Sequence, residues 1–281
     1  MLAALAIVLA PHPGPLPVGE GREVSLIRAL ALGPSPCGGG GRYNAGMVIE
    51  PTAAFLEQAG AQGISFDDGD LERFGRYLSL LVEANASFNL TRITEPEAMW
   101  ERHILDSLTL LSMLSELPAG AKVVDVGSGG GAPGIPLAIA LPEVSFVLVE
   151  SVGKKAAFLR ETVSAMGLSN VEVVNDRVET VGQSREHRES YDAATARALG
   201  AMRVAAELVT PLVKVGGSAY FIKGQKAHEE LGDAKKALHM LHTPVAGVVD
   251  TPTGKIVVLD KPRKTPGLYP RRAGEPKRDP L

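Results

Sequence analysis

A short strand-like run that ends in an acid and a glycine-rich turn constrains the fold of this chain more than any other feature. Residues 123–131 read VVDVGSGGG. The β-branched residues predict a buried strand, and the glycines predict a tight turn in which the backbone can approach a ligand closely. Residues 133–141, PGIPLAIAL, predict the helix that follows, with both prolines in its first turn. This order is typical of a strand, a nucleoside-binding turn and a crossover helix.

Two acidic residues on either side of the turn indicate which nucleoside binds there. Asp125 precedes the turn, where a carboxylate would repel the pyrophosphate of a dinucleotide but would suit a cationic ammonium group. Glu150 ends the next predicted strand and is placed to accept hydrogen bonds from ribose hydroxyls. S-adenosylmethionine (AdoMet) carries both groups. We therefore expect Asp125, Gly127, Gly129 and Glu150 to bind AdoMet.

The glycine pattern alone also fits a second class of proteins. Gly127, Gly129 and Ala132 match the loose dinucleotide motif, and similar turns occur in α/β proteins with other ligands. A nicotinamide dehydrogenase is therefore an alternative interpretation. Asp125 is the residue that argues against it.

The rest of the chain alternates predicted strands with predicted helices. Strands are expected at residues 123–126, 144–150, 171–175, 191–196, 217–222, 245–249 and 256–259, and helices near residues 133–141, 154–166, 201–212 and 225–241. Such alternation predicts an α/β fold, a mainly parallel sheet of six to seven strands with helices on both faces. Apolar residues at helical spacing before residue 117 predict a small N-terminal helical cap.

Charge is unevenly distributed along the chain. The formal net charge is −3, but residues 260–281 hold seven Lys or Arg against three acidic residues, and residues 47–259 are acidic. A basic segment rich in Pro and Arg favours binding to a nucleic-acid backbone. A solvated terminus is the other interpretation of the same charges.

Residues 1–46 have the composition of a segment outside the fold. They are rich in Pro and Gly, and the apolar start lacks the basic residues of a signal peptide and the length of a membrane span. We expect a non-native or disordered extension that precedes a natural start at Met47. The lone cysteine, Cys37, lies in this extension, so disulfides and cysteine-rich metal sites are not expected, and no metal is predicted. The expected divisions are residues 1–46 (extension), 47–117 (cap), 118–260 (AdoMet-binding domain) and 261–281 (basic tail).

A series of short motifs resembles one family. These are FNLT at 88–91, RHILDS at 102–107, PGIP at 133–136, SVGKK at 151–155, RVE at 177–179, ARA at 196–198, KGQ at 223–225 and YPRR at 269–272. In these motifs the chain from about Met47 to its end is similar to the RsmG family, also called glucose-inhibited division protein B. Residues 1–46 have no counterpart in that pattern.

The resemblance implies a class I AdoMet-dependent methyltransferase, Rossmann-like in fold, that modifies N7 of one guanine in 16S ribosomal RNA near the decoding site. It implies a cytoplasmic, monomeric enzyme whose partner is 16S rRNA or the small ribosomal subunit. Carried over by motif, the cofactor contacts are Gly127, Ala132, Val178, Glu179 and Arg197. Ala132 is a departure, because family members often carry a larger apolar residue there.

The chemistry of guanine N7 requires no proton transfer, because that atom already carries a free lone pair. No acid or base is therefore assigned, and Arg197 is predicted to position the reactants. Basic residues in the matched motifs and in the tail are candidates for binding RNA: Arg92, Arg102, His103, Lys154, Lys155, Arg177, Arg197, Lys223, Arg271 and Arg272. For His103, one helical turn from Asp106, a role in tying the cap to the sheet is the competing interpretation. The rival functions are methylation of another RNA or a small molecule, and ribosome assembly without catalysis.

Overall fold

The computed structural model describes residues 48–281, and the extension predicted for residues 1–46 lies outside the described residues. Seven strands form one sheet: β1 (Lys122–Val126), β2 (Ser145–Val149), β3 (Val171–Val174), β4 (Tyr191–Arg197), β5 (Val213–Lys223), β6 (Val245–Thr251) and β7 (Gly254–Asp260). Each predicted strand is present, so the predicted α/β fold is confirmed. Within residues 48–281, no helix is both long and apolar enough to span a bilayer.

The strand order, β3-β2-β1-β4-β5-β7-β6, determines where a ligand can bind. Strands β1 to β5 pair in parallel, whereas β7 is antiparallel to both β5 and β6. The chain moves outward from β1 to β3 and then returns to β4 on the other side of β1. This reversal leaves a crevice at the carboxyl ends of β1 and β4, where open α/β sheets bind their ligands.

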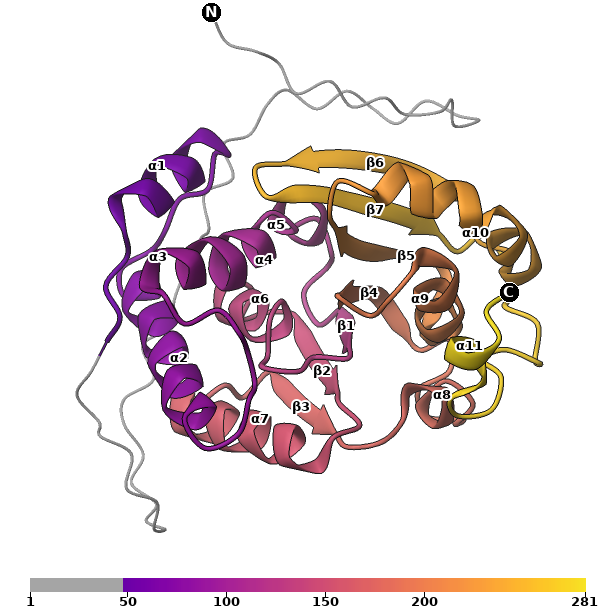
Figure 1. Cartoon of the computed structure of the whole chain (residues 1–281), viewed down its shortest axis with the longest axis horizontal. Helices are drawn as coiled ribbons and strands as arrows, with labels where there is room; N and C mark the ends of the chain where they lie inside the picture. Colours follow the sequence, from indigo (N-terminus) through magenta and orange to yellow (C-terminus); the bar gives the residue numbers. More distant parts are fainter. Residues whose placement is uncertain (1–47) are drawn as a thin grey trace, which may run out of the picture.

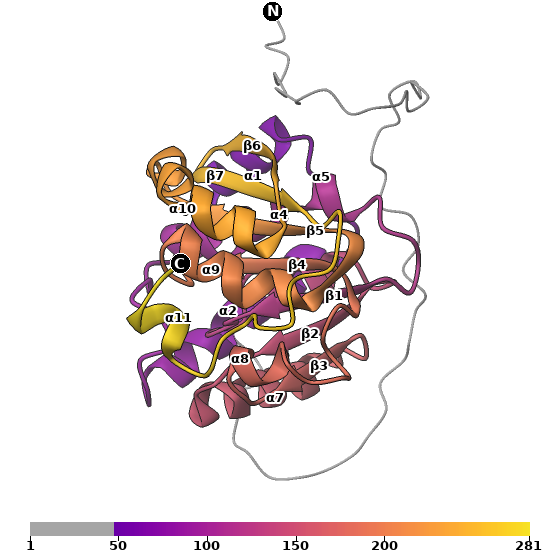
Figure 2. The ribbon, with the colours of Figure 1, turned by 90° about the vertical axis from the view of Figure 1, so that its right-hand side faces the viewer.

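Helices cover both faces of the sheet (Figures 1 and 2). Alternate residues of β1 face opposite layers, because side chains alternate along a strand. Val123 packs in the core formed with α6 and α7, and Val124 packs in the core formed with α9 and α10. The helices after β1 are α6 (Gly134–Ala140), α7 (Gly153–Met166), α8 (Val178–Val181), α9 (Met202–Val209), the 3-10 helix η2 (Thr210–Leu212), α10 (Ala227–Leu241) and α11 (Glu275–Arg278).

The N-terminal part of the described chain is helical, as predicted. It comprises α1 (Ala53–Ala61), α2 (Asp70–Asn85), α3 (Pro96–Met99), the π-helix η1 (Trp100–Leu105), α4 (Asp106–Leu108) and α5 (Leu111–Leu114). Trp100 is fully buried, and its ring centroid lies 4.6 Å from that of Phe55. These helices share one core with the sheet, including Val123 and Phe146. The cap therefore packs directly on the sheet face that carries α6 and α7.

The basic C-terminal segment is docked on the fold, and so it is not a solvated terminus. After β7 it passes beside α8 and α9 and forms the short helix α11 (Figures 1 and 2). Lys261, Tyr269 and Pro276 are buried along its course. The Lys261 ammonium donates to the carbonyl oxygens of Thr210 and Val213 at 2.7 and 2.9 Å. Part of the basic charge of this segment is thus committed to the fold.

Candidate cofactor and RNA site

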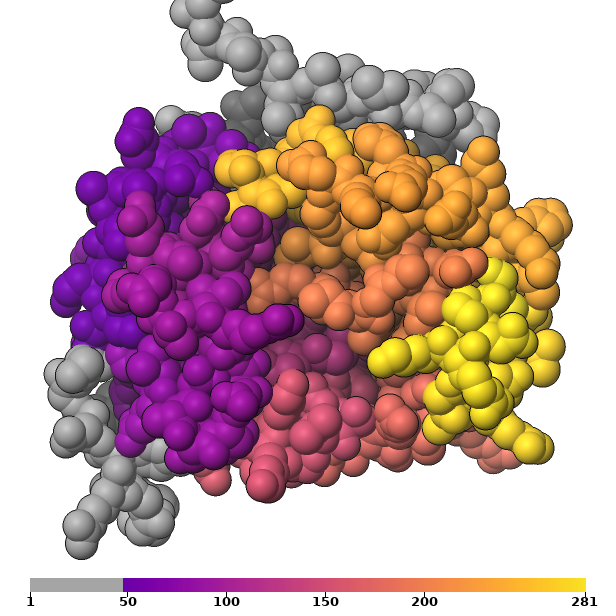
Figure 3. All heavy atoms as spheres, in the orientation of Figure 1, coloured from indigo at the N-terminus to yellow at the C-terminus, as the bar shows by residue number. Residues whose placement is uncertain are grey.

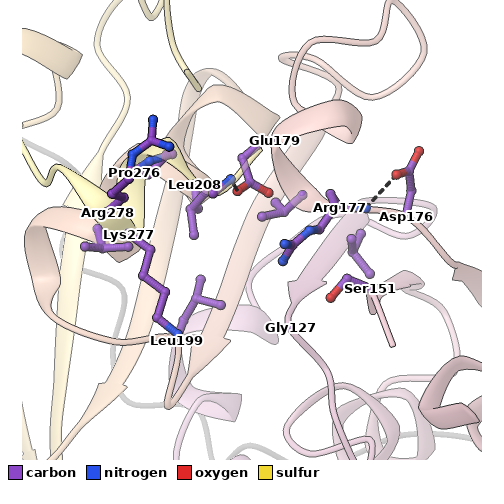
Figure 4. A pocket seen from close by; sticks show the side chains of 14 residues that line it. Gly127, Ser151, Asp176, Arg177, Glu179, Leu199, Leu208, Pro276, Lys277 and Arg278 are labelled. Carbon is purple, nitrogen blue, oxygen red and sulfur yellow. Dashed lines mark hydrogen bonds between the residues drawn. The ribbon is translucent and has the colours of Figure 1, made fainter. Parts of the chain in front are cut away.

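A cavity of about 440 Å³ lies at the carboxyl ends of the central strands (Figure 4). In the space-filling view, the same face of the molecule is hollowed between the cap and the C-terminal segment (Figure 3). The residues that line the cavity end or follow the strands β1 to β4, or belong to α8, α9 and the end of the chain. They are Gly127, Val149, Ser151, Asp176, Arg177, Val178, Glu179, Leu199, Val204, Leu208, Gly274, Pro276, Lys277 and Arg278.

The turn after β1 depends on glycine at position 127. Gly127 has a φ of +73°, in the left-handed region, and its amide donates to the Val149 carbonyl at 2.9 Å. A Cβ atom on this residue would lie 2.8 Å from Cδ1 of Leu199 on the opposite wall. Only glycine therefore keeps the cavity floor open at this point.

Glu150 connects the turn to the neighbouring strand. Its Oε2 accepts a hydrogen bond from the Gly129 amide at 2.9 Å, and its Oε1 accepts one from the Val152 amide at 2.7 Å. The side chain of Asn175 donates to the Glu150 carbonyl at 2.8 Å. Each carboxylate oxygen has a further lone pair, so Glu150 can still accept a hydroxyl from a ligand. The residue next to it, Ser151, lines the cavity.

Asp125 lies beneath the turn and does not line the cavity, which differs from the expected direct approach to a ligand. It is fully buried, and its Oδ1 accepts from the Thr195 hydroxyl at 2.9 Å. The other oxygen, Oδ2, has no hydrogen-bond partner within residues 48–281. Burial raises the pKa of this carboxyl to about 6, against hydrogen bonds to Ser128 and Thr195 that lower it. Its carbonyl accepts from the Ser128 hydroxyl at 3.0 Å, so Asp125 also supports the turn.

A second group of polar residues surrounds Arg197 at the carboxyl end of β4. Its guanidinium lies 3.2 Å from Nδ1 of His103 and 3.9 Å from Oδ2 of Asp106, and it also donates to the Arg102 carbonyl. Nε2 of His103 lies 3.3 Å from the Thr91 hydroxyl. Arg197 therefore links the sheet to the π-helix of the cap.

The same network extends to the hairpin between β6 and β7. The Thr253 hydroxyl donates to Oδ1 of Asp106, and Arg102 donates to the Thr253 carbonyl at 3.2 Å. Burial and, to a smaller extent, the charge of Arg197 lower the pKa of His103 to about 3. Burial raises the pKa of Asp106 to about 6, which Arg197 and Arg102 oppose. His103 is consequently a neutral, buried residue at physiological pH.

Comparison with known proteins decides the family. The family model described as "GidB: rRNA small subunit methyltransferase G" matches residues 70–255. The chain belongs to this family. Ribosomal RNA small subunit methyltransferase G of Sorangium cellulosum is 43% identical over 224 residues, which cover 80% of this chain and 93% of that protein. The protein of the same name from Leuconostoc citreum is 40% identical over 241 residues, 84% of this chain and 100% of that protein.

Solved structures agree on the architecture. A protein from Corynebacterium glutamicum has a TM-score of 0.50 and 12% identity, and the match covers 76% of this chain and 99% of that chain. At this identity the likeness concerns the fold alone. Family membership confirms the three predictions drawn from the motifs, namely a class I methyltransferase fold, AdoMet as the cofactor and the methylation of ribosomal RNA.

The residues around the cavity fit AdoMet. The glycine at position 127 leaves room that a Cβ atom would fill, and the orphaned Oδ2 of Asp125 lies under the turn. Val178 and Glu179 line the cavity from α8. Ala132 is buried in the turn before Pro133 and does not line the cavity. Arg197 lies in the network with His103 and does not line it either.

The structure divides the predicted RNA-binding residues into two groups. Arg92, Arg102, Lys154, Arg177 and Arg272 are exposed and Lys155 is half-buried, so these six side chains are accessible to RNA. His103, Lys223 and Arg271 are already engaged within the fold, and the tenth candidate, Arg197, lies in the network with His103 described above.

Each of the three engaged residues has a defined partner. Lys223 binds Oε2 of Glu230 at 2.8 Å and the Gly200 carbonyl at 2.6 Å. Arg271 forms two hydrogen bonds, at 2.6 and 2.8 Å, with the carboxylate of Glu207, which is fully buried. His103 is neutral and buried, so in this structure all three side chains stabilise the fold, and their binding to RNA stays a prediction.

The sequence did not indicate that the chain end contributes a wall to the cavity. Glu179 accepts the Gly274 amide at 2.7 Å, and this bond holds the segment before α11 against α8. Pro276, Lys277 and Arg278 complete that wall. A helix of four residues has too few positions to show a hydrophobic period. Only the basic composition of the tail therefore indicated a functional role, which was RNA binding.

Proposed function

We propose that this enzyme transfers the methyl group of AdoMet to N7 of a guanine in 16S ribosomal RNA, near the decoding site. The observation that carries the proposal is the membership of the family. At the carboxyl end of β4, His103 is neutral and its Nδ1 lies 3.2 Å from the guanidinium of Arg197, so neither residue is a free general base. Such a site suits an acceptor atom that has a lone pair and no proton to lose.

AdoMet supplies an electrophilic methyl group on a sulfonium, and the protein residues supply alignment. Glu150 is proposed to accept the ribose hydroxyls, and the backbone at Gly127 and Gly129 is proposed to hold the methionine part. Val178 and Glu179 border the space for the adenine ring. Alignment of nitrogen, methyl carbon and sulfur then lowers the barrier without proton transfer.

Arg197 is proposed to act as a positioning residue. Its bonds to the Arg102 carbonyl and to His103 fix the cap relative to the end of β4. The target guanine must enter between these elements, so their spacing sets the approach of N7 to the methyl group. A displacement of about 1 Å in such an arrangement can lower a rate by roughly a hundredfold.

The accessible cations are proposed to hold the RNA around this site. Lys154 and Lys155 lie in the first turn of α7, where the helix dipole disfavours positive charge. Arg92, Arg177 and Arg272 are exposed on other elements. We propose that they contact phosphates of the small ribosomal subunit in the cytoplasm, with the enzyme acting as a monomer.

Methyl transfer from labelled AdoMet tests the proposal. Unmodified small ribosomal subunits and naked 16S rRNA are each incubated with the enzyme, and the RNA is then reduced and treated with aniline, which cleaves at N7-methylguanine. A single cleavage near the decoding site is expected. Label without cleavage would contradict the N7 assignment, and the absence of label from an enzyme that binds AdoMet would contradict this substrate.

A further inference from the structure

The C-terminal segment is fixed in place as part of the site. Arg271 is bound by the buried carboxylate of Glu207, and Gly274 is bound by Glu179, which itself lines the cofactor cavity. Pro276 is buried directly after these two anchors. The residues that follow Pro276 therefore have a defined position beside the cavity.

The cations of this segment differ in what they contact. Lys261 and Arg271 are engaged with carboxylates and carbonyls of the fold. Lys277 and Arg278 line the cofactor cavity, and Arg177 lines it from the N-cap position before α8. Among residues 48–281, none of these three forms an ion pair with a carboxylate. The cavity thus carries these three cations without an ion-pair partner among the described residues, together with the carboxylates of Asp176 and Glu179.

The direction of the side chains selects Lys277 among the three. In Figure 4 its side chain extends past Leu199 toward the cavity, and the Arg177 guanidinium points into the same space from the opposite side. The Arg278 side chain points away from that space. Leu199, Val204 and Leu208 make the wall beside Lys277 apolar, so this wall offers the ammonium group no anionic partner.

We propose that Lys277 binds a backbone phosphate of the RNA next to the target guanine, with Arg177 as the opposing cation. The sulfonium of the cofactor is itself positive, so it does not require these two cations. The RNA brings one phosphate per nucleotide, and a flipped guanine brings its phosphates to the mouth of the cavity. The proposal rests on the proposed function and assigns the docked tail to substrate binding.

The test compares two lysines of the same segment. Lys277→Met removes the charge and keeps the aliphatic stem, and Lys264→Met is the matched control, because Lys264 is exposed and does not line the cavity. RNA affinity is measured against salt concentration, and AdoMet affinity is measured separately by calorimetry. Lys277→Met is expected to weaken RNA binding roughly tenfold and to lower the salt slope by about one. Lys264→Met is expected to change RNA affinity by no more than about twofold. Lys277→Arg is expected to restore RNA binding.

Two results would overturn the proposal. Equal RNA binding by Lys277→Met and Lys264→Met would show that the phosphate is not held there. A loss of AdoMet affinity with unchanged RNA binding would assign Lys277 to the carboxylate of the cofactor. Both results leave methylation by the wild-type enzyme intact, so they are distinct from failure of the proposed function, in which the wild type itself would not modify the RNA.

Discussion

The ion pair between Glu207 and Arg271 provides the most quantitative prediction from this structure. Glu207 is fully buried on α9, and Arg271 approaches it through its backbone amide, Nε and Nη2 at 3.0, 2.8 and 2.6 Å. The Arg271 side chain is 12% exposed and also lies 3.9 and 4.0 Å from the carboxylates of Glu275 and Asp279. The two partners therefore differ in what remains when the other is removed.

Arg271→Met leaves a buried carboxylate without a counter-charge, which destabilises a protein by about 3–5 kcal/mol. Glu207→Met leaves an arginine that still reaches solvent and two other carboxylates, so its effect is expected to be smaller, about 1–2 kcal/mol. The double variant replaces the pair by apolar side chains of similar length. It is expected to lie within about 1 kcal/mol of the wild type, because neither charge is left behind.

Urea unfolding of the four proteins measures these differences. With a slope of about 2–3 kcal/mol/M, Arg271→Met is expected to lower the midpoint by about 1–2.5 M. A loss below about 1 kcal/mol for this variant would contradict the reasoning, since it would mean that the tail lifts away and lets water reach Glu207. A double variant as unstable as the sum of the single variants would also contradict it.

Three further predictions concern the turn, the network and pH. Gly127→Ala is expected to weaken AdoMet binding at least tenfold, as measured by calorimetry. Gly120→Ala, also at positive φ but with open space around it, is the control and should leave AdoMet binding unchanged. Equal AdoMet affinities of the two variants would contradict this prediction. Arg197→Ala is expected to lower methyl transfer by roughly a hundredfold, with exposed Arg203→Ala as the control, and near-normal turnover would refute the positioning role. Because the pKa of Asp106 is raised from 3.8 to about 6, its ionised form is disfavoured in the folded protein. As the pH rises from about 4 to about 6, the free energy of unfolding of the wild type should therefore fall by up to about 3 kcal/mol relative to that of Asp106→Asn. Curves of unfolding free energy against pH that run parallel for the two proteins would contradict this prediction.

The sheet could be predicted from the sequence because its strands are covered on both faces. The β1 residues Val123, Val124, Asp125 and Val126 are all fully buried, and all of them except Asp125 are apolar. The glycine turn was equally legible, since the φ of Gly127 requires glycine. Local requirements of this kind can be predicted directly from the residue types in the sequence.

Interactions between residues that are far apart in the sequence could not be predicted in this way. Arg271 and Glu207 are 64 positions apart, so the sequence did not show that Arg271 has an acidic partner. The basic motif around Arg271 therefore resembled a phosphate-binding segment. Lys223 pairs with Glu230 only because the chain turns between β5 and α10. A pattern of charges does not show which cations the fold itself will neutralise.

The short helices also could not be predicted from the sequence. Helices α8 and α11 have four residues each, which is about one turn and too short for a repeated apolar position. Their place in the structure depends on the bond between Glu179 and Gly274. The wall that they build around the cavity therefore became visible only in three dimensions.

Analysis of small-subunit RNA from cells tests the central claim most directly. The gene for this chain is deleted and then restored as wild type or as Gly127→Ala, and the nucleosides of the RNA are quantified by mass spectrometry. We expect N7-methylguanine at one position near the decoding site to disappear on deletion, to return with the wild type and to remain absent with the variant. Retention of that nucleoside in the deletion strain, or full restoration by the variant, would contradict the assignment of this cavity to methyl transfer.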